Sequence, residues 1–382
     1  MAPGYSTDSV SLARMSVGES TGWIAQSLAI AEEIGWRAGA AYTYVSASNI
    51  LGTLGQYNQA FEQVRRGLAV AEEIEHRQWI CFAHRTLGIL YRDLLDLPRA
   101  RRHLEESIRV AQEVGSLFHV RQGTAYLTSL LIAHHELDQA ATLLSSVFDP
   151  DLPVEPLAQR RIWLARAELA LAQGDPALAL QIVDRLLAVT ANVESQEPGA
   201  VPYLARLRGE GLAALRQSTE AEAIFRSALV TAQAQGTPRF VWPLHLALGK
   251  LLRAQRRHAE AAQAFAAART VIEGMAAALV DVELRATFVR QATALLPTPR
   301  LPTSRQVAKA TYGGLTLREQ EVAALIAQGQ SNRAIAETLI IGERTVEGYV
   351  ANIMAKLGFS SRSQIATWVV ERGLERDDRM RG

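Results

Sequence analysis

The chain has 382 residues, a formal net charge of +1, 48% hydrophobic residues and only 6% aromatic residues. This length favours two or more domains, and the abundance of alanine and leucine favours helix over sheet. The near-neutral charge gives no global basic field that would advertise a nucleic-acid partner. The single cysteine, Cys81, excludes an internal disulfide and fits a reducing cytoplasm, which is the expected location. The chain opens without a signal-peptide pattern and no apolar run reaches the ~20 residues of a membrane span, so no membrane partner is expected.

A repeat of about 40 residues fills the first 275 residues. The segments "SLAIAEEIG", "GLAVAEEIE" and "SIRVAQEVG" begin at Ser27, Gly67 and Ser107, which lie 40 residues apart. A second pattern extends the series, in which an alanine is followed four positions later by an apolar residue. Its alanines, spaced by 39 to 42 residues, are Ala60, Ala100, Ala140, Ala179, Ala221 and Ala261. A partial copy begins at Ser20.

A small residue stands twelve positions before each of these alanines. The six are Ser48, Gly88, Thr128, Ala167, Gly209 and Gly249. Such pairs of small residues indicate two antiparallel helices per unit that cross closely. Turn signals lie between the two helices of each unit: "GQYN", "LDLP", "HELD", "QGDP", "RQST" and "QRRH".

These repeats resemble a tetratricopeptide-type solenoid with helices longer than in the standard motif. After an N-terminal tail at 1–17, the array is expected over 18–296, with a capping helix at 279–296. Arrays of this type bind peptides, proteins or small effectors on a concave face, so an effector or protein partner in the groove is expected. A spacer or a support for dimerisation is the alternative. A linker at 297–313, rich in proline, glycine and basic residues, follows.

Nothing in the sequence indicates catalysis or a bound cofactor. The eight histidines form no metal-binding spacing, and no Ser/His/Asp or Cys/His arrangement is evident. The pair Gly249-Lys250 is followed by Leu251 and does not belong to a phosphate-binding loop. The chain is therefore predicted not to be an enzyme and to need no cofactor or metal.

From Gly314 onward the sequence pattern changes and predicts four short helices with clear start and stop signals. Thr316 and Glu319 form a capping box at the first start, and Ser331 caps the second helix. The third helix is expected from Arg344 to Lys356, ending at Gly358, and a capping box of Ser361 with Gln364 opens the fourth. This spacing predicts a compact helical domain over 314–376, followed by a tail at 377–382.

The segments "LTLREQEV", "SNRAIAETL", "RTV" and "KLGFSSRSQ" occur in an order and spacing that resembles the LuxR-type, or GerE-type, helix-turn-helix of bacterial regulators. The predicted fold class is therefore all-α: a tetratricopeptide-like helical-repeat solenoid followed by a four-helix LuxR-type domain. The resemblance implies binding to double-stranded DNA, usually as a homodimer, with the third helix in the major groove. The fourth helix is the usual dimer surface, where Trp368 is either an anchor or a buried aromatic of one domain.

The resemblance assigns a set of DNA contacts. They are Ser331, Asn332, Arg344, Thr345, Glu347, Gly348, Tyr349, Ala351, Asn352, Lys356 and Arg362. The two helix starts and the two later basic residues are expected at phosphates, and Glu347, Gly348 and Ala351 at base edges. Three apolar residues of the same helix, Val346, Val350 and Ile353, are expected in the core instead.

The sequence departs from the family at three of its positions. The family often carries Lys where Glu347 stands, His where Tyr349 stands and Ser where Gly342 stands. Glutamate can accept a hydrogen bond from a cytosine amino group, and Gly348 and Ala351 leave room for a thymine methyl. Residues 314–372 carry equal numbers of acidic and basic side chains, so modest affinity and a need for dimerisation are expected.

The two halves together resemble the large ATP-dependent LuxR regulators, which include the maltose-regulon activator, without their NTPase module. Either the chain is a shortened regulator or it is the C-terminal part of a longer one. We expect a bacterial transcription regulator whose repeats respond to an effector or partner, with RNA polymerase as a further candidate partner. The alternative is a repeat-based interaction scaffold whose helix-turn-helix no longer binds DNA specifically.

Overall fold

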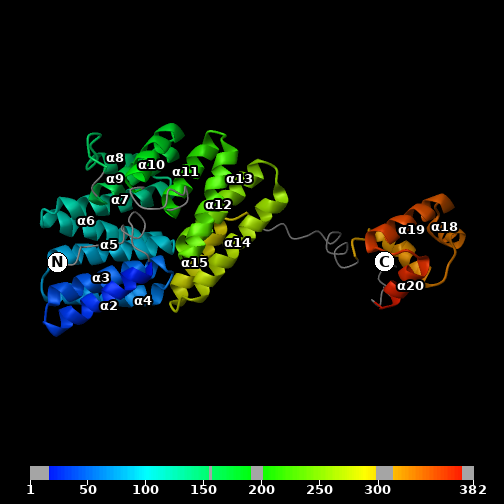
Figure 1. The fold of residues 1–382 in the computed structure, drawn as a ribbon, viewed down its shortest axis with the longest axis horizontal. Coiled ribbons are helices and arrows are strands. Elements are labelled where there is room, and N and C mark those ends of the chain that lie inside the picture. Colours follow the sequence, from blue (N-terminus) through cyan, green and yellow to red (C-terminus); the bar gives the residue numbers. More distant parts are fainter. Residues whose placement is uncertain (1–16, 155–156, 191–200, 298–312, 372–382) are drawn as a thin grey trace. The chain divides into compact units, whose positions relative to one another are not determined.

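The computed structural model describes residues 17–154, 157–190, 201–297 and 313–371, and every regular element in these ranges is an α-helix. The chain divides into two compact units, residues 1–297 and 298–382 (Figure 1). The tails and the linker predicted from sequence lie almost wholly outside the described residues. Within the described ranges, no helix is both long and apolar enough to cross a membrane.

The first unit is a stack of helix pairs, as the repeat predicts. Its helices are α2 (Val17–Glu33), α3 (Arg37–Thr53), α4 (Tyr57–Glu73), α5 (Arg77–Asp93), α6 (Leu97–Glu113), α7 (Leu117–Ala133), α8 (Leu137–Ser145), α9 (Leu157–Ala172), α10 (Pro176–Thr190), α11 (Pro202–Ala214), α12 (Ser218–Ala234), α13 (Pro238–Ala254), α14 (His258–Ala277) and α15 (Val282–Ala294). Helices α3 to α7 are each 17 residues long and are separated by turns of three residues. Two such helices with their turns make the 40-residue period, which confirms the all-α stack of repeats.

Ten of the turns between consecutive helices of the array share one conformation. The middle residue of each of these three-residue turns is left-handed, with φ between 54° and 84°: Gly35, Gly55, Glu75, Leu95, Gly115, His135, Gly174, Arg216, Gly236 and Arg256. The next N–H reaches back to a carbonyl five residues earlier, as from His76 to Ala71 at 2.8 Å and from Asp96 to Tyr91 at 2.9 Å. This Schellman pattern satisfies the carbonyls at each helix end and fixes the angle at which the next helix leaves. The six turn signals read from the sequence all fall at these points.

Packing within a helix pair depends on the small residues. The six recurring alanines are all buried. A Cβ atom on Gly88 would lie 2.6 Å from Leu104 Cγ, and one on Gly249 would lie 2.6 Å from Phe265 Cε1. The small residue therefore makes room for the large apolar side chain sixteen positions later, on the partner helix. This differs from the expected meeting of two small residues, because the large side chain fills the space that the missing Cβ leaves.

One repeat departs from the expected length. The pattern predicts helix through Val147 and Phe148, but α8 ends at Ser145. The hydroxyls of Ser145 and Ser146 donate to the carbonyls of Thr142 and Leu143 at 2.7 Å, which caps the helix early. Phe148 then packs edge-on against a tryptophan of α9, with ring centroids 4.9 Å apart. The apolar positions of the pattern are thus kept buried by a loop instead of a helix.

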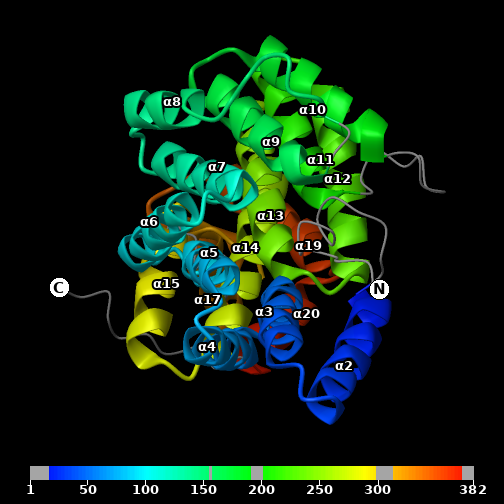
Figure 2. The same ribbon diagram turned by 90° about the vertical axis from the view of Figure 1, so that its left-hand side faces the viewer.

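The array bends until its late helices meet its early ones. The side chain of Asn58 on α4 donates to the carbonyl of Ala278 at 2.5 Å and accepts from the N–H of Val280 at 3.1 Å. Arg239 on α13 forms an ion pair with Asp93 on α5 at 2.9 Å. Figures 1 and 2 both show α4 beside the yellow helices α14 and α15. One hydrophobic core accordingly contains residues from α3 through α15.

Replacing Gly88 by alanine tests the close approach inside a helix pair. We expect Gly88→Ala to lower the free energy of unfolding of the array by about 1–3 kcal/mol, because the new methyl overlaps the buried Leu104. Gly274→Ala, on α14, is the matched control, because a Cβ there meets nothing within 4 Å. That control should gain up to about 1 kcal/mol of helix propensity. Urea titration followed by tryptophan fluorescence measures both, since five of the six tryptophans lie in the array. Equal shifts in the two variants would contradict the packing argument.

Burial lowers the pKa of four histidines in the array, His84, His103, His119 and His245. The Nδ1 atoms of His84 and His103 lie 3.0 Å apart, so one carries the proton and the other accepts it. Burial, with the neighbouring His84, lowers the pKa of His103 to about 4. Burial and the cation of Arg85 lower the pKa of His119 to about 3. Among the described residues, no group of three or more His, Cys, Asp or Glu side chains is placed to hold a metal ion.

These depressed histidine pKa values predict a stability that falls in mild acid. An exposed histidine titrates near pH ~6.5, so between that pH and about 4 the unfolded chain binds a proton that folded His103 refuses. The free energy of unfolding should therefore fall as the pH drops through this window and should stop responding to His103 below it. His103→Gln should flatten the decline in a series of urea titrations, whereas His258→Gln, at an exposed position, should leave it unchanged. A decline of the same steepness in both variants would refute the assignment.

Candidate nucleic-acid interface

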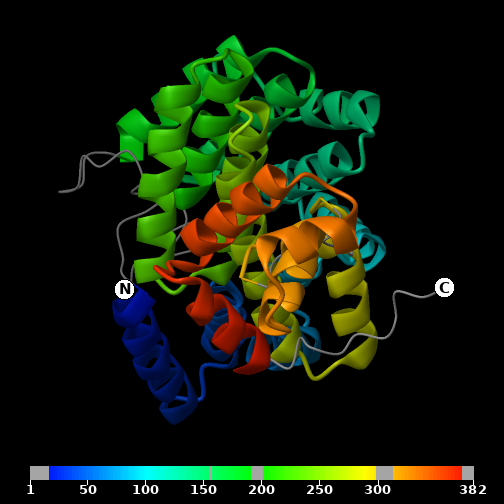
Figure 3. The same ribbon diagram turned by 90° about the vertical axis from the view of Figure 1, so that its right-hand side faces the viewer.

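The described part of the second unit, residues 313–371, forms four short helices with the predicted start and stop signals (Figure 3, orange to red). They are α17 (Leu317–Ala327), α18 (Asn332–Leu339), α19 (Glu343–Leu357) and α20 (Arg362–Glu371). Thr316 and Glu319 form the complete capping box predicted for α17, and the Ser331 hydroxyl accepts from the N–H of Ala334 at 3.2 Å to cap α18. Gly358, left-handed at φ 68°, ends α19. The sequence therefore specifies where α17 and α18 begin and where α19 ends.

The start of α20 differs from its prediction in one detail. The Gln364 side chain accepts from the backbone N–H of Ser361 at 3.0 Å and of Ser360 at 2.8 Å. The hydroxyl of Ser361 lies 3.0 Å from that of Ser363. The glutamine half of the capping box forms, while the serine hydroxyl has a neighbouring hydroxyl as its partner.

Helix α19 is divided lengthwise into a buried and an exposed face. Val346, Val350 and Ile353 are buried in the core of the unit, as predicted, together with Ile335 of α18 and Ile365 of α20. The candidate contacts on the opposite face are exposed: Arg344, Thr345, Glu347, Gly348, Ala351 and Asn352. Tyr349 is half-buried against the core. Because helical positions three and four apart lie on one face, the exposed residues form a continuous strip along α19.

The middle of this strip carries only small side chains. A Cβ atom at Gly348 would meet nothing within 4 Å, and Ala351 adds only a methyl group. Gly342 caps α19 without a side-chain hydrogen bond, as expected for glycine in place of serine. At Gly348 and Ala351, beyond the longer side chains of Arg344 and Glu347, the strip can therefore approach a flat surface or a groove wall closely.

The N-terminus of α18 is tied to that of α20. The Arg362 guanidinium donates to the side-chain oxygen of Asn332 at 2.6 Å and to the carbonyl of Gln330. Burial lowers the pKa of Arg362. The hydroxyl of Ser331 is already used as the cap of α18. Three of the predicted contacts, Ser331, Asn332 and Arg362, are thus brought together at one place, where the free N–H groups of α18 also lie.

Lys356 is engaged within the unit. Its ammonium lies 2.5 Å and 2.6 Å from the two carboxylate oxygens of Glu319, which is buried at 3% exposure. Burial opposes ionisation of Glu319, but the Lys356 ammonium and the hydrogen bonds from Thr316 outweigh it and hold its pKa below the usual range. The pair joins α17 to α19 from positions 37 residues apart.

The comparisons with known proteins agree with this geometry. The family described as "Bacterial regulatory proteins, luxR family" (GerE) matches residues 314–369. The chain is 44% identical over 66 residues to the transcriptional regulatory protein YhcZ of Bacillus subtilis, covering 17% of this chain and 31% of YhcZ. It is 38% identical over 58 residues to the DNA-binding transcriptional activator DevR/DosR of Mycobacterium tuberculosis, covering 15% of this chain and 27% of that protein.

The second unit contains a LuxR-type helix-turn-helix domain. The likeness to these relatives covers under a third of their length and lies in this domain. They are transcriptional regulators, so this part of the chain is a DNA-binding domain of that class. Among solved structures, BtubC (BKLC) from P. vanneervenii aligns with 58% of this chain and 94% of its own at 15% identity and a TM-score of 0.40.

Sequence reasoning missed two features of the LuxR-type domain. The partnership of Lys356 with Glu319 carries no local signal, because a separation of 37 residues is set by packing alone. Ile340, in the turn before α19, is left-handed at φ 54° and 91% exposed. A β-branched residue in that conformation is an outlier, and glycine or asparagine would have announced it.

Removing the ammonium of Lys356 separates its structural role from a DNA contact. Lys356→Met leaves the buried Glu319 carboxylate without its cation, so the LuxR-type domain should lose about 1–3 kcal/mol, read from hydrogen exchange of peptides in 313–371. Adding Glu319→Gln should recover part of this loss. The slope of log affinity for DNA against log salt should stay unchanged in Lys356→Met.

Arg344→Met is the matched control, because the Arg344 side chain is exposed at the start of α19. This variant should reduce the salt slope by about 1 while leaving stability unaltered. A reduced slope in Lys356→Met with unchanged hydrogen exchange would contradict the structural role of Lys356.

Proposed function

We propose that the chain is a bacterial transcription regulator in which a tetratricopeptide-type array binds an effector or protein partner and thereby controls a LuxR-type domain that reads DNA in the cytoplasm. The observation that carries the proposal is the exposed strip on α19, which is presented by a capped and packed domain. A helix-turn-helix that no longer bound DNA would not need both its helix caps and a separate solvent-exposed strip of residues.

The proposed contacts divide by chemistry. The N-terminus of α18 at Ser331 and Asn332, with Arg362 beside it, offers N–H groups and a cation to a phosphate. Arg344 and Thr345 would approach the backbone at the start of α19. Along the strip, Glu347, Gly348, Ala351 and Asn352 would face base edges, with Tyr349 at the margin. Lys356 would contribute little to DNA binding, because two of its hydrogen bonds go to Glu319.

Dimerisation follows from the weak electrostatics of one domain. Residues 314–372 have no net charge, so few counterions are released when one copy binds. Two copies on paired half-sites would double the contact area without any change in a single domain. Helix α20 is the proposed dimer surface, with Trp368 half-buried and Val370 53% exposed. RNA polymerase is a further candidate partner of the DNA-bound form.

DNA selection by the full chain tests the reading function. Random duplex DNA should yield one enriched motif, and Glu347→Ala should lower affinity for it and relax the preferred base at one position, a loss of about 1–3 kcal/mol. Glu371→Ala removes the same charge at an exposed position at the end of α20 and should leave the motif unchanged. No enrichment by the wild-type chain would reject sequence reading and favour the scaffold function.

A further inference from the structure

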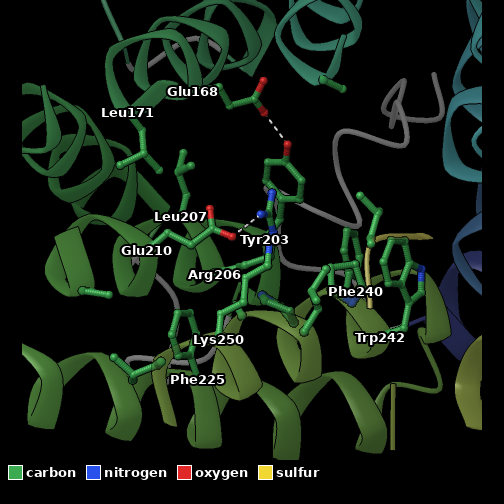
Figure 4. A pocket seen from close by; sticks show the side chains of 18 of the residues that line it. Glu168, Leu171, Tyr203, Arg206, Leu207, Glu210, Phe225, Phe240, Trp242 and Lys250 are labelled. Atoms are coloured by element: carbon green, nitrogen blue, oxygen red, sulfur yellow. Dashed lines mark hydrogen bonds and ion pairs between the residues drawn. The ribbon is translucent and has the colours of Figure 1, made fainter. Parts of the chain in front are cut away.

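A cavity of about 1010 Å³ lies in the array at the place where its late helices meet its early ones. Its walls come from α5, α7, α9, α11, α12 and α13, together with Leu295, which directly follows α15 (Figure 4). Asp93 of α5 and Arg239 of α13 both line it, and their ion pair forms part of its wall. A ligand here would touch segments that are about 150 residues apart in the chain. The volume suits a small organic molecule.

The charges that line the cavity are unbalanced. Its acidic side chains are Asp93, Glu168 and Glu210. Its basic side chains are Arg92, Arg206, Arg216, Arg239 and Lys250. The wall therefore has an excess of two positive charges.

Each acid already has its partners in the wall. Asp93 accepts from Arg92 and pairs with Arg239, both at 2.9 Å. Glu210 pairs with Arg206 at 2.5 Å, and Glu168 accepts from the hydroxyls of Tyr203 and Ser129. Figure 4 shows these bonds to Tyr203 and Arg206. The acids thus stabilise the wall and have little capacity left to bind a cationic ligand.

Two of the basic side chains are not neutralised. Lys250, on α13, and Arg216, in the turn before α12, form no ion pair with any described residue. Both are exposed, so each can turn toward a ligand without breaking an existing contact. An anion is the complementary charge for this pair.

The rest of the wall is apolar and rich in rings. Phe240 and Trp242 from α13, Tyr203 from α11 and Phe225 from α12 line it, with Leu171 and Leu207 between them (Figure 4). Tyr203 is half-buried and Phe240 and Trp242 are 8% and 7% exposed, so parts of these rings can pack against a flat group of a ligand, whereas Phe225, at 1% exposure, adds almost no contact area. A compact inorganic anion would leave this surface unused.

We propose that the cavity binds a small organic anion that carries an aromatic or other flat apolar group. Lys250 and Arg216 receive the anionic group, and the ring-lined wall receives the flat group. The residues proposed to hold the ligand lie on α11, α12 and α13 and in the turn between α11 and α12, and the ion pair that joins α13 to α5 is part of the same wall. This inference rests on the proposed function, in which such a ligand is the effector that acts on DNA binding.

The probe for this site is 8-anilinonaphthalene-1-sulfonate, which joins a sulfonate to flat aromatic rings. Its matched neutral counterpart, N-phenyl-1-naphthylamine, has the same rings and no anionic group. Fluorescence and calorimetric titration of the full chain should give one sulfonate bound per chain and at least tenfold weaker binding of the neutral dye. Equal affinities for the two dyes, or many weak equivalents of the sulfonate, would overturn the proposal, because they indicate adventitious adsorption to apolar surface.

Charge reversal on a single helix locates the binding. Lys250→Glu should weaken binding of the sulfonate dye at least tenfold and that of the neutral dye less than twofold. Arg253→Glu, on the same helix and exposed but outside the cavity wall, should change neither by more than twofold. Arg216→Glu is the second cavity variant and should resemble Lys250→Glu. Circular dichroism melting shows that each variant is folded, and equal effects of Lys250→Glu and Arg253→Glu would reject the site.

DNA titration of the same proteins separates this proposal from the proposed function. Dye binding that needs Lys250 supports the cavity site whether or not the chain selects a DNA motif. If the chain selects a DNA motif but binds the two dyes equally, or binds the sulfonate dye without needing Lys250, the anion site is overturned and the DNA-reading function still stands. A shift of DNA affinity on adding the sulfonate dye, absent in Lys250→Glu, supports the cavity as the effector site.

Discussion

The close approach of two helices within each repeat is the constraint on which the array depends. A small residue on one helix lets the large apolar side chain sixteen positions later pack against the backbone, as Gly88 does for Leu104 and Gly249 for Phe265. In the turns that contain a left-handed residue, this residue fixes the angle at which the next helix leaves. Since each pair repeats nearly the same geometry, small rotations between pairs accumulate in one direction. The result is an array curved enough for α4 and α5 to meet α13 and the segment after α14.

Closure of the array changes the character of its concave side. An open solenoid offers a long groove, which suits an extended peptide. Here the ion pair of Arg239 with Asp93 and the contacts of Asn58 join distant helices, and the space beside them is a bounded cavity. The buried hydroxyl of Tyr57, near Asp93 and Arg239, has no hydrogen-bond partner among the described residues. Asp93, Arg239 and Asn58 form directional contacts across this seam, which hold it together with apolar burial. Such contacts can be made or lost as a set, which gives a ligand at the seam leverage over the shape of the array.

What the sequence predicted, and what it did not, follows from the range of each interaction. Helix pairs, turns and the caps of α17, α18 and α19 depend on residues within about twenty positions, and their patterns repeat or match known cap chemistry. The early end of α8 was missed because the apolar pattern continues past the two serines whose hydroxyls cap the helix. A pair of serines in a sequence does not by itself predict a helix end. The partners of Lys356 and Arg239 lie 37 and 146 positions away and are set by packing that no local pattern encodes. The face of α19 was readable, because one helical period places Val346, Val350 and Ile353 in the core and leaves its neighbours outside.

The electrostatics of the LuxR-type domain explain why an array would be attached to it. Of its six basic side chains, Lys356 is paired with Glu319, and Arg318 and Arg333 form ion pairs with glutamates of their own helices. A single copy therefore has few cations to give to phosphates, and its affinity for DNA of any sequence should be low. In the proposed function, pairing of two copies would decide whether DNA is occupied. A modest change in the free energy of pairing, well within the binding energy of a small ligand, would then be enough to move the domain between free and bound states. Weak intrinsic affinity is the property that would let an array that binds an effector act on the DNA-binding domain.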